Sequence, residues 1–217
     1  MHTEPYLKDL IVELKKQWPD NKTINIVCHG HSVPSGYFAT PMVDTFNAYP
    51  HLLHRELKAR FPFAVINVIV TGIGGEHSET GNQRFFDTVL CHKPDLITID
   101  YGLNDRGIGL EKASAAWSDM ITQSLNQGSK VILLTPTPDQ SVNPQKENAN
   151  NTPLHDHAKQ IRKLSEEFNV GLSDSFSESL IYAKEHTLSD ILSWSNHPNL
   201  QGHQIVTKLL MRYFEII

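Results

Sequence analysis

The sequence lacks the features that mark several large classes of protein. It has 2 cysteines without the paired spacing of a zinc or redox motif, so we expect Cys28 and Cys91 to be reduced and mostly buried. No apolar stretch approaches the roughly 20 residues that span a bilayer. Basic and acidic residues, 19 and 24 in number, are interspersed without a basic block. We therefore expect neither a membrane nor a nucleic acid as a partner.

Internal repeats, low-complexity tracts and domain linkers are also missing, and the composition is ordinary. A chain with 39% hydrophobic and 20% charged residues is not expected to be disordered. Its 217 residues suffice for one sizeable core, so we predict a single domain over residues 1–217. The first fourteen residues are charged and amphipathic, unlike a secretory signal, which predicts a cytoplasmic location.

Short runs rich in Ile and Val predict the buried strands of a parallel sheet, because most show little alternation of apolar and polar residues. These runs are 24–28, 64–70, 95–100, 130–134 and 170–173. Apolar residues at helical spacing predict helices at 6–18, 45–60, 81–91, 111–126, 153–168 and 200–214. Strands that alternate with helices indicate βαβ units and an α/β fold.

Candidate catalytic residues follow the ends of these predicted strands. Ser32, Gly75 and Asn104 each lie a few residues beyond the carboxyl end of a run. Ligands of open parallel sheets bind at that edge, so we expect these residues to meet in space. With His197 they supply a hydroxyl, an imidazole and amide donors, which are the parts needed to attack an acyl carbon and stabilise an oxyanion. The sequence thus indicates an esterase-like hydrolase.

The polar segment 135–152, which is rich in Pro and Asn, follows the fourth predicted strand. Its composition predicts an irregular loop on the same rim as Ser32. No large apolar lid is evident in the sequence. We therefore expect an ester of a short acyl group, such as acetyl on a carbohydrate or a similar polar alcohol, rather than a long lipid chain.

Four blocks of the sequence, in order, resemble those of the SGNH/GDSL hydrolases, and the resemblance spans nearly the whole chain. The blocks are Gly30-His31-Ser32, Thr71-Gly72-Ile73-Gly74-Gly75-Glu76, Tyr101-Gly102-Leu103-Asn104-Asp105, and Asn196-His197-Pro198-Asn199 with Gly202-His203. In the first block, His31 stands where the family usually has Asp. The resemblance implies a flavodoxin-like three-layer α/β/α sandwich with a five-stranded parallel sheet.

The resemblance also implies a serine ester hydrolase. We expect no cofactor, because Gly72-Ile73-Gly74-Gly75 lacks the full dinucleotide fingerprint, and no metal in the leading hypothesis. Ser32 would be the nucleophile, and His197 would be the general base and then the general acid. The oxyanion would accept hydrogen bonds from the main-chain amides of Ser32 and Gly75 and from the side chain of Asn104. Each such donor is typically worth ~10²–10³ in rate.

One position departs from the family pattern at the histidine block. The family usually places an Asp three residues before the histidine, where this chain has Trp194. A main-chain carbonyl can accept the same Nδ1–H bond as a carboxylate. We therefore predict a Ser32–His197 dyad that is oriented by the carbonyl of Trp194 or a near neighbour. Asp190 lies seven positions before His197 and would need an unusual turn to reach it.

Two other functions stay open from the sequence. A non-catalytic member of the same fold would keep the pocket but bind a ligand or partner, and the missing Asp supports this alternative. A metal-dependent hydrolase could use His29 and His31, because a His-x-His pair after a strand can hold a metal. No third ligand with a clear spacing accompanies that pair. The sequence does not fix the oligomeric state.

Overall fold

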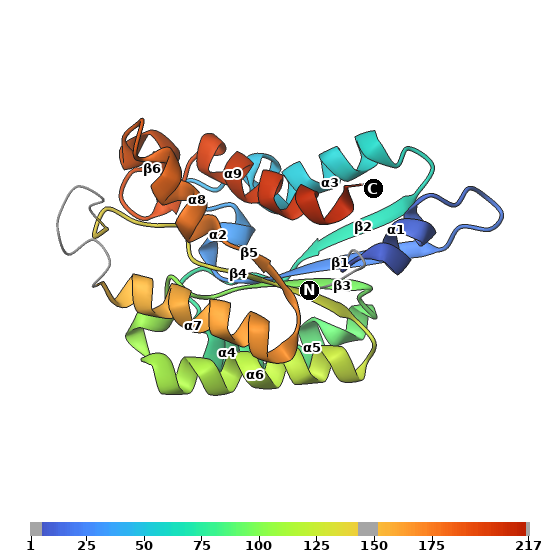
Figure 1. The fold of residues 1–217 in the computed structure, drawn as a ribbon, viewed down its shortest axis with the longest axis horizontal. Helices are drawn as coiled ribbons and strands as arrows, with labels where there is room; N and C mark the ends of the chain where they lie inside the picture. Colours follow the sequence, from blue (N-terminus) through green and yellow to red (C-terminus); the bar gives the residue numbers. More distant parts are fainter. Residues whose placement is uncertain (1–5, 143–151, 216–217) are drawn as a thin grey trace.

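The computed structural model of the protein describes residues 6–142 and 152–215 (Figure 1). At its centre is a five-stranded parallel sheet in the order β2-β1-β3-β4-β5. The strands are β1 (Thr23–Gly30), β2 (Val65–Val70), β3 (Leu96–Asp100), β4 (Lys130–Leu134) and β5 (Gly171–Ser173). Each of them falls on a predicted run, and β4 has the predicted bounds.

Helices cover both faces of this sheet (Figure 1). On one face lie α3 (Tyr49–Arg60), α8 (Ser175–Tyr182) and α9 (Leu200–Met211), and on the other lie α4 (Ser78–Gln83), α5 (Phe85–Thr88), α6 (Leu110–Asn126) and α7 (Pro153–Phe168). A further helix, α1 (Lys8–Leu14), precedes β1. The strand order is that of flavodoxin-like sheets. The predicted three-layer α/β/α sandwich is therefore confirmed.

The core has two parts because successive side chains of a strand point to opposite faces of the sheet. Ile26 and Cys28 of β1 pack in the cluster that includes α3 and α9. Val27, between them, packs in the cluster under α6 that includes the buried side chain of Trp117. Both faces of the strand are thus covered, which explains why its sequence shows little alternation.

The helical prediction differs from the structure mainly before β3. The predicted helix 81–91 is divided into α4, α5 and the 3₁₀ turn η2 (Leu90–His92). The break falls at Arg84, whose side chain bonds to Glu76 and to the carbonyl of Thr71. The prediction that Cys91 is buried is wrong, because the shortened turn leaves it exposed, whereas Cys28 is buried as predicted.

Short elements lie at the carboxyl edge of the sheet, most of them in segments for which no helix or strand was predicted. These are α2 (Ser32–Ser35), the 3₁₀ turns η1 (Thr45–Asn47), η3 (Asp105–Gly107) and η4 (Leu188–Ile191), and a hairpin of β6 (Leu192–Ser193) and β7 (His197–Pro198); η5 (Arg212–Phe214) ends the described chain. The predicted loop 135–152 is irregular over 135–142, and 143–151 lie outside the described residues. Among the helices of the described ranges, none has the length and apolarity to cross a membrane.

Candidate active site

Ser32 is placed by a sharp turn between β1 and α2. Gly30 ends the strand, and a Cβ atom at this position would lie 2.3 Å from the carbonyl oxygen of Asp100, so the close approach of β1 to β3 requires glycine. His31 then caps α2, since its Nδ1 accepts a bond from the main-chain N–H of Val33 at 3.2 Å. The result is a serine at the first residue of a helix beyond the sheet edge, with 6% of its surface exposed.

The imidazole of His197 lies against this hydroxyl. Its Nε2 is 2.9 Å from Oγ of Ser32, although the two residues are 165 positions apart in the chain. His197 starts the second strand of the β6–β7 hairpin, and Asn199 caps α9 directly after it. The side chain of Asn199 also donates to the carbonyl of Asp190 at 2.9 Å, which fixes the hairpin to the preceding turn.

The other nitrogen of His197 contacts a main-chain carbonyl. Nδ1 lies 2.8 Å from the carbonyl oxygen of Phe38. The predicted kind of acceptor is present, but the prediction of Trp194 is wrong. Trp194 has a left-handed φ of 70° at the tip of the hairpin, and its carbonyl accepts a bond from Nε2 of Gln140 at 2.8 Å. Asp190 bonds to the N–H of Thr187 within its own turn.

The Phe38 contact determines the tautomer of His197. A carbonyl can only accept, so Nδ1 carries the proton and Nε2 presents a lone pair to the hydroxyl of Ser32. Burial lowers the pKa of His197 below its ordinary value, and the bond to Phe38 offsets this in part. The imidazole is therefore neutral at neutral pH and suited to accept a proton.

A second imidazole touches Ser32. Nδ1 of His31 lies 3.2 Å from Oγ of Ser32, and its Nε2 lies 3.5 Å from Oδ1 of Asp100. Both His31 and Asp100 are buried. Because Nδ1 of His31 accepts the N–H of Val33, this nitrogen carries no proton and its one lone pair is already engaged, which leaves the hydroxyl proton of Ser32 for His197. The histidine that replaces the family's usual Asp thus serves as the helix cap.

The residues 71–76, here called the glycine segment, pack against the Ser32 turn. The N–H of Ile73 donates to the carbonyl of Gly30 at 3.1 Å. A Cβ on Gly72 would lie 2.4 Å from Oγ of Ser35 and 2.7 Å from the carbonyl oxygen of His31. The second and first blocks of the sequence therefore meet in space through a position that requires glycine.

The two predicted amide donors are linked through Glu76. Gly75 has a φ of +79°, in the region that favours glycine, and it directly precedes Glu76. Nδ2 of Asn104 donates to the carbonyl of Glu76 at 2.9 Å. The loops after β2 and β3 are thus joined at the donors that the sequence singled out.

Tyr37 is a site residue that the sequence did not reveal. Its ring centroid lies 6.1 Å from that of His197. A Cβ on Gly74 would lie 3.1 Å from the hydroxyl oxygen and from Cζ of Tyr37, so the ring also packs on the glycine segment. Its position between the first two sequence blocks, five residues after Ser32, is a signal that could have identified it as a site residue. Phe38 gave no signal, since every residue has a carbonyl.

His29, proposed as a metal ligand, faces a different set of partners. Its Nδ1 lies 2.8 Å from Oγ1 of Thr71, and its Nε2 lies 3.0 Å from the hydroxyl of Tyr101. Burial, with Arg84 nearby, lowers the pKa of His29 to about 3. The described ranges, 6–142 and 152–215, contain no group of three His, Cys, Asp or Glu side chains suited to hold a metal. No observation favours the metal-dependent alternative.

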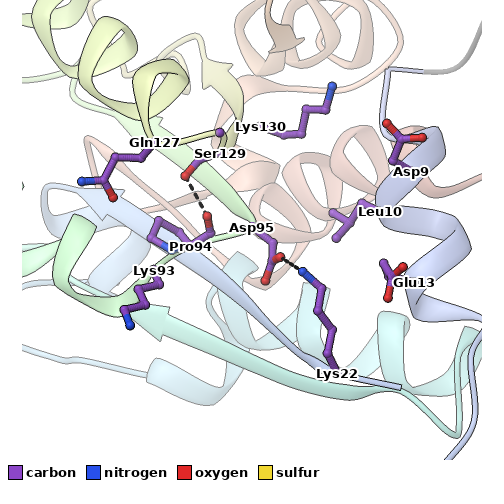
Figure 2. Close-up of a pocket in the computed structure, with 11 residues that line it drawn as sticks. Asp9, Leu10, Glu13, Lys22, Lys93, Pro94, Asp95, Gln127, Ser129 and Lys130 are labelled. Atoms are coloured by element: carbon purple, nitrogen blue, oxygen red, sulfur yellow. Dashed lines mark hydrogen bonds and ion pairs between the residues drawn. The ribbon is translucent and has the colours of Figure 1, made fainter. Parts of the chain in front are cut away.

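A hollow of about 490 Å³ lies at the opposite end of the sheet (Figure 2). It is lined by residues that immediately precede β1, β3 and β4, including Lys22, Asp95 and Ser129. Lys22 is paired there with Asp95 at 2.6 Å. This pocket lies at the amino ends of the strands and is therefore separate from Ser32, which lies beyond the carboxyl end of β1.

Residues 28–205 match the GDSL-like lipase/acylhydrolase family, which covers most of the chain. The chain belongs to this family. The resemblance predicted from the four sequence blocks is confirmed, and membership makes the protein an acylhydrolase of the serine ester hydrolase type.

Relatives in sequence and structure include esterases of acetylated xylan. The chain is 22% identical over 172 residues to an acetylxylan esterase of Geobacillus stearothermophilus. This match covers 72% of this chain and 75% of the relative. A crystal structure of a catalytic mutant of an acetylxylan esterase from that organism aligns with a TM-score of 0.77 at 20% identity over 94% of this chain and 97% of the other. A putative GDSL-like lipase from Parabacteroides merdae gives 0.72 at 20% identity, with 88% and 95% covered.

The residue three positions before His197 differs from the residue at the same distance before the mutated histidine of that esterase. Catalytic mutants of the Geobacillus enzyme replace a serine, an aspartate and a histidine with alanine, and the aspartate lies three positions before the histidine. This chain has Trp194 at that distance from His197.

Proposed function

We propose that this protein is a serine esterase that removes a short acyl group through a covalent acyl-enzyme. The observation that carries the proposal is the 2.9 Å contact between Oγ of Ser32 and Nε2 of His197. Ser32 attacks the ester carbonyl carbon while His197 takes the hydroxyl proton. Collapse of the tetrahedral intermediate breaks the bond to the alcohol oxygen, which receives that proton. Water then repeats the sequence and releases the carboxylic acid.

In this proposal the oxyanion accepts bonds from the main-chain N–H groups of Ser32 and Gly75 and from the side chain of Asn104. Two observations support this arrangement. The glycine segment packs on the Ser32 turn, and the bond from Asn104 to Glu76 joins both loops. Fixed donors of this kind act on charge that develops in the transition state, and each is typically worth ~10²–10³ in kcat.

The proposed substrate is an acetyl ester of a carbohydrate. The relatives named as acetylxylan esterases support this class. The ring of Tyr37, which lies next to Gly74 and 6.1 Å from the ring of His197, would limit the size of the acyl group in this proposal. Trp194, with 73% of its surface exposed three positions before His197, offers a flat apolar surface on the rim for the alcohol part.

The experiment measures ester hydrolysis with p-nitrophenyl acetate, butyrate and octanoate, and acetate release from acetylated xylo-oligosaccharides. We expect the acetyl esters to have the highest kcat/KM. Ser32→Ala should lower kcat by about 10³-fold or more, as expected for loss of a nucleophile.

Ser35→Ala is the matched control on the same helix. Its hydroxyl donates to the carbonyl of His31 at 2.9 Å, so its loss removes one hydrogen bond. We expect kcat to fall by less than about tenfold, which is the scale of one such bond. Equal hydrolysis by wild type and Ser32→Ala would refute the proposal, and a preference for octanoate would refute the short acyl group.

A further inference from the structure

A cluster of polar side chains lies beneath the glycine segment, apart from Ser32 and His197. It consists of Glu76, Arg84, Tyr101 and His29. The side chains of Glu76 and Arg84 are 8% and 20% exposed, and Tyr101 is fully buried. Taking charges and hydroxyls out of water costs free energy unless each is paired, so the pairing within this cluster is informative.

Arg84 holds both ends of the glycine segment. Its Nε donates to Oε1 of Glu76 at 2.8 Å, and a second nitrogen pairs with Oε2 of the same carboxylate. That second nitrogen also donates to the carbonyl oxygen of Thr71 at 2.6 Å. One guanidinium therefore connects the first residue of the segment to the last, in the two-pronged geometry that makes such pairs directional.

Tyr101, the residue directly after β3, completes the anchoring of Glu76. Its hydroxyl donates to Oε2 of Glu76 at 2.7 Å and lies 3.0 Å from Nε2 of His29. Burial raises the pKa of Tyr101, so the hydroxyl keeps its proton and donates it to the carboxylate. Nε2–H of His29 then donates to the hydroxyl oxygen, and its Nδ1 accepts from Oγ1 of Thr71.

The main chain of Glu76 connects this anchor to the proposed oxyanion donors. Gly75 directly precedes Glu76, and the carbonyl of Glu76 accepts a bond from Nδ2 of Asn104 at 2.9 Å. A side-chain amide has two N–H groups. The bond to Glu76 uses one and fixes the direction of the other.

We propose that the Glu76–Arg84 pair, braced by Tyr101, positions the two oxyanion donors, the N–H of Gly75 and the side chain of Asn104. The inference rests on the proposed function and assigns positioning roles to residues that do not touch the substrate. Donors that act on the transition state raise kcat more than they change KM. Loosening the anchor should therefore lower kcat and leave KM nearly unchanged.

A double-mutant cycle between Glu76→Gln and Asn104→Ala tests the coupling. Glu76→Gln keeps the shape of the side chain but removes its charge. We expect it to lower kcat about 10- to 100-fold, the scale of a misplaced catalytic group, with KM changed by less than about threefold. Because Glu76 also positions Gly75, the double variant should be slower than Asn104→Ala alone, but by a factor clearly smaller than the one that Glu76→Gln causes in the wild-type protein.

Asp174→Asn provides a matched control, because Asp174 forms another partly buried pair with arginine, at 2.8 Å from Nε of Arg162. Its effect on kcat should multiply with that of Asn104→Ala. If the effects of Glu76→Gln and Asn104→Ala on kcat also multiply, the inference is overturned and Glu76 has a merely structural role.

Tyr101→Phe gives a second test if Glu76→Gln does not fold, because it removes one hydroxyl and leaves the ion pair in place. We expect the same coupling to Asn104→Ala with a smaller loss of kcat. Ser32→Ala, measured alongside, separates the two levels of the argument. If Ser32→Ala retains wild-type activity, the proposed function fails. If Ser32→Ala is inactive but the effects of the anchor variants and Asn104→Ala on kcat multiply, only this inference is overturned.

Discussion

The carbonyl oxygen of Phe38 lies 2.8 Å from Nδ1 of His197 and occupies the place of a triad carboxylate. Like a carboxylate, a carbonyl fixes the tautomer and the orientation of the ring. Unlike a carboxylate, it carries no full charge to stabilise the imidazolium that forms during the reaction. In the proposed function the site works as a dyad, and the difference has consequences that can be measured.

Asp190 should be dispensable for catalysis. Its carboxylate accepts the N–H of Thr187 at 3.0 Å in the 3₁₀ turn η4, and the acceptor for His197 is Phe38. We expect Asp190→Asn to keep kcat within about threefold of wild type, the range of an indirect effect. His197→Ala is the positive control and should abolish turnover. Loss of kcat by orders of magnitude in Asp190→Asn would show that a carboxylate orients the imidazole after all.

The pH dependence of kcat/KM should reflect the environment of His197. Burial lowers its pKa. Its Nδ1 contacts the carbonyl of Phe38, in the described part of the chain, instead of a carboxylate that would raise the pKa. The base acts when neutral, so activity should persist on acidification until the pH falls through that lowered pKa. We therefore expect the acid limb of the profile to have its midpoint below 6.5. A midpoint at 7 or above would contradict this account.

His31 should act through Nδ1 rather than Nε2. An Asn side chain places an acceptor near the position of Nδ1, whereas a Gln side chain places its polar group near Nε2. We expect His31→Asn to keep the cap on Val33 and to retain kcat/KM within about tenfold of wild type. His31→Gln should lose the cap and fall further, with a stability loss of ~1 kcal/mol. Equal kcat/KM and equal urea midpoints for the two variants would refute the capping role.

The sequence predicted the sheet and the helices over 111–126 and 153–168 well because long apolar patterns determine them. The helix 81–91 was mispredicted because Arg84 bonds to residues 71 and 76, outside any local window. Periodicity cannot detect such tertiary bonds.

Like the fold, the candidate site was predicted only in part from the sequence. The serine, glycine and amide blocks that the sequence singled out lie on loops that meet through Gly72 and Glu76, and the histidine block joins them through the contact between His197 and Ser32. The acceptor for His197 could not be predicted by residue, since a main-chain carbonyl belongs to any amino acid. Only the folded path after α2 brings that of Phe38 to the imidazole, while the left-handed turn at Trp194 accompanies a bond to Gln140 instead.

Stability should fall on mild acidification because of buried histidines. Burial lowers the pKa of His203 to about 3, with His197 adding to the effect, while its Nδ1 accepts the N–H of Tyr49. Below pH 6.5 the unfolded state binds a proton that the folded state does not, so the free energy of unfolding decreases as the pH falls. Between pH 7 and pH 5 this histidine should account for about 2 kcal/mol.

Urea denaturation of His203→Asn measures this contribution. Asn keeps an acceptor for Tyr49 but does not titrate, so its loss of stability between pH 7 and pH 5 should be about 2 kcal/mol smaller than that of wild type. His186→Asn is the control, because His186 is exposed and its replacement should leave the wild-type slope. A slope unchanged by His203→Asn would show that the ring is protonated in the folded protein.

The central claim is that His197 activates the hydroxyl of Ser32, and covalent labelling tests it most directly. The protein is treated with a fluorophosphonate probe, and the modified residue is identified by mass spectrometry of peptides from wild type, His197→Ala and Asp190→Asn. The account predicts one adduct on Ser32 in wild type and in Asp190→Asn, and almost none in His197→Ala. An unmodified Ser32 in the folded wild-type protein, or equal labelling without His197, would contradict it.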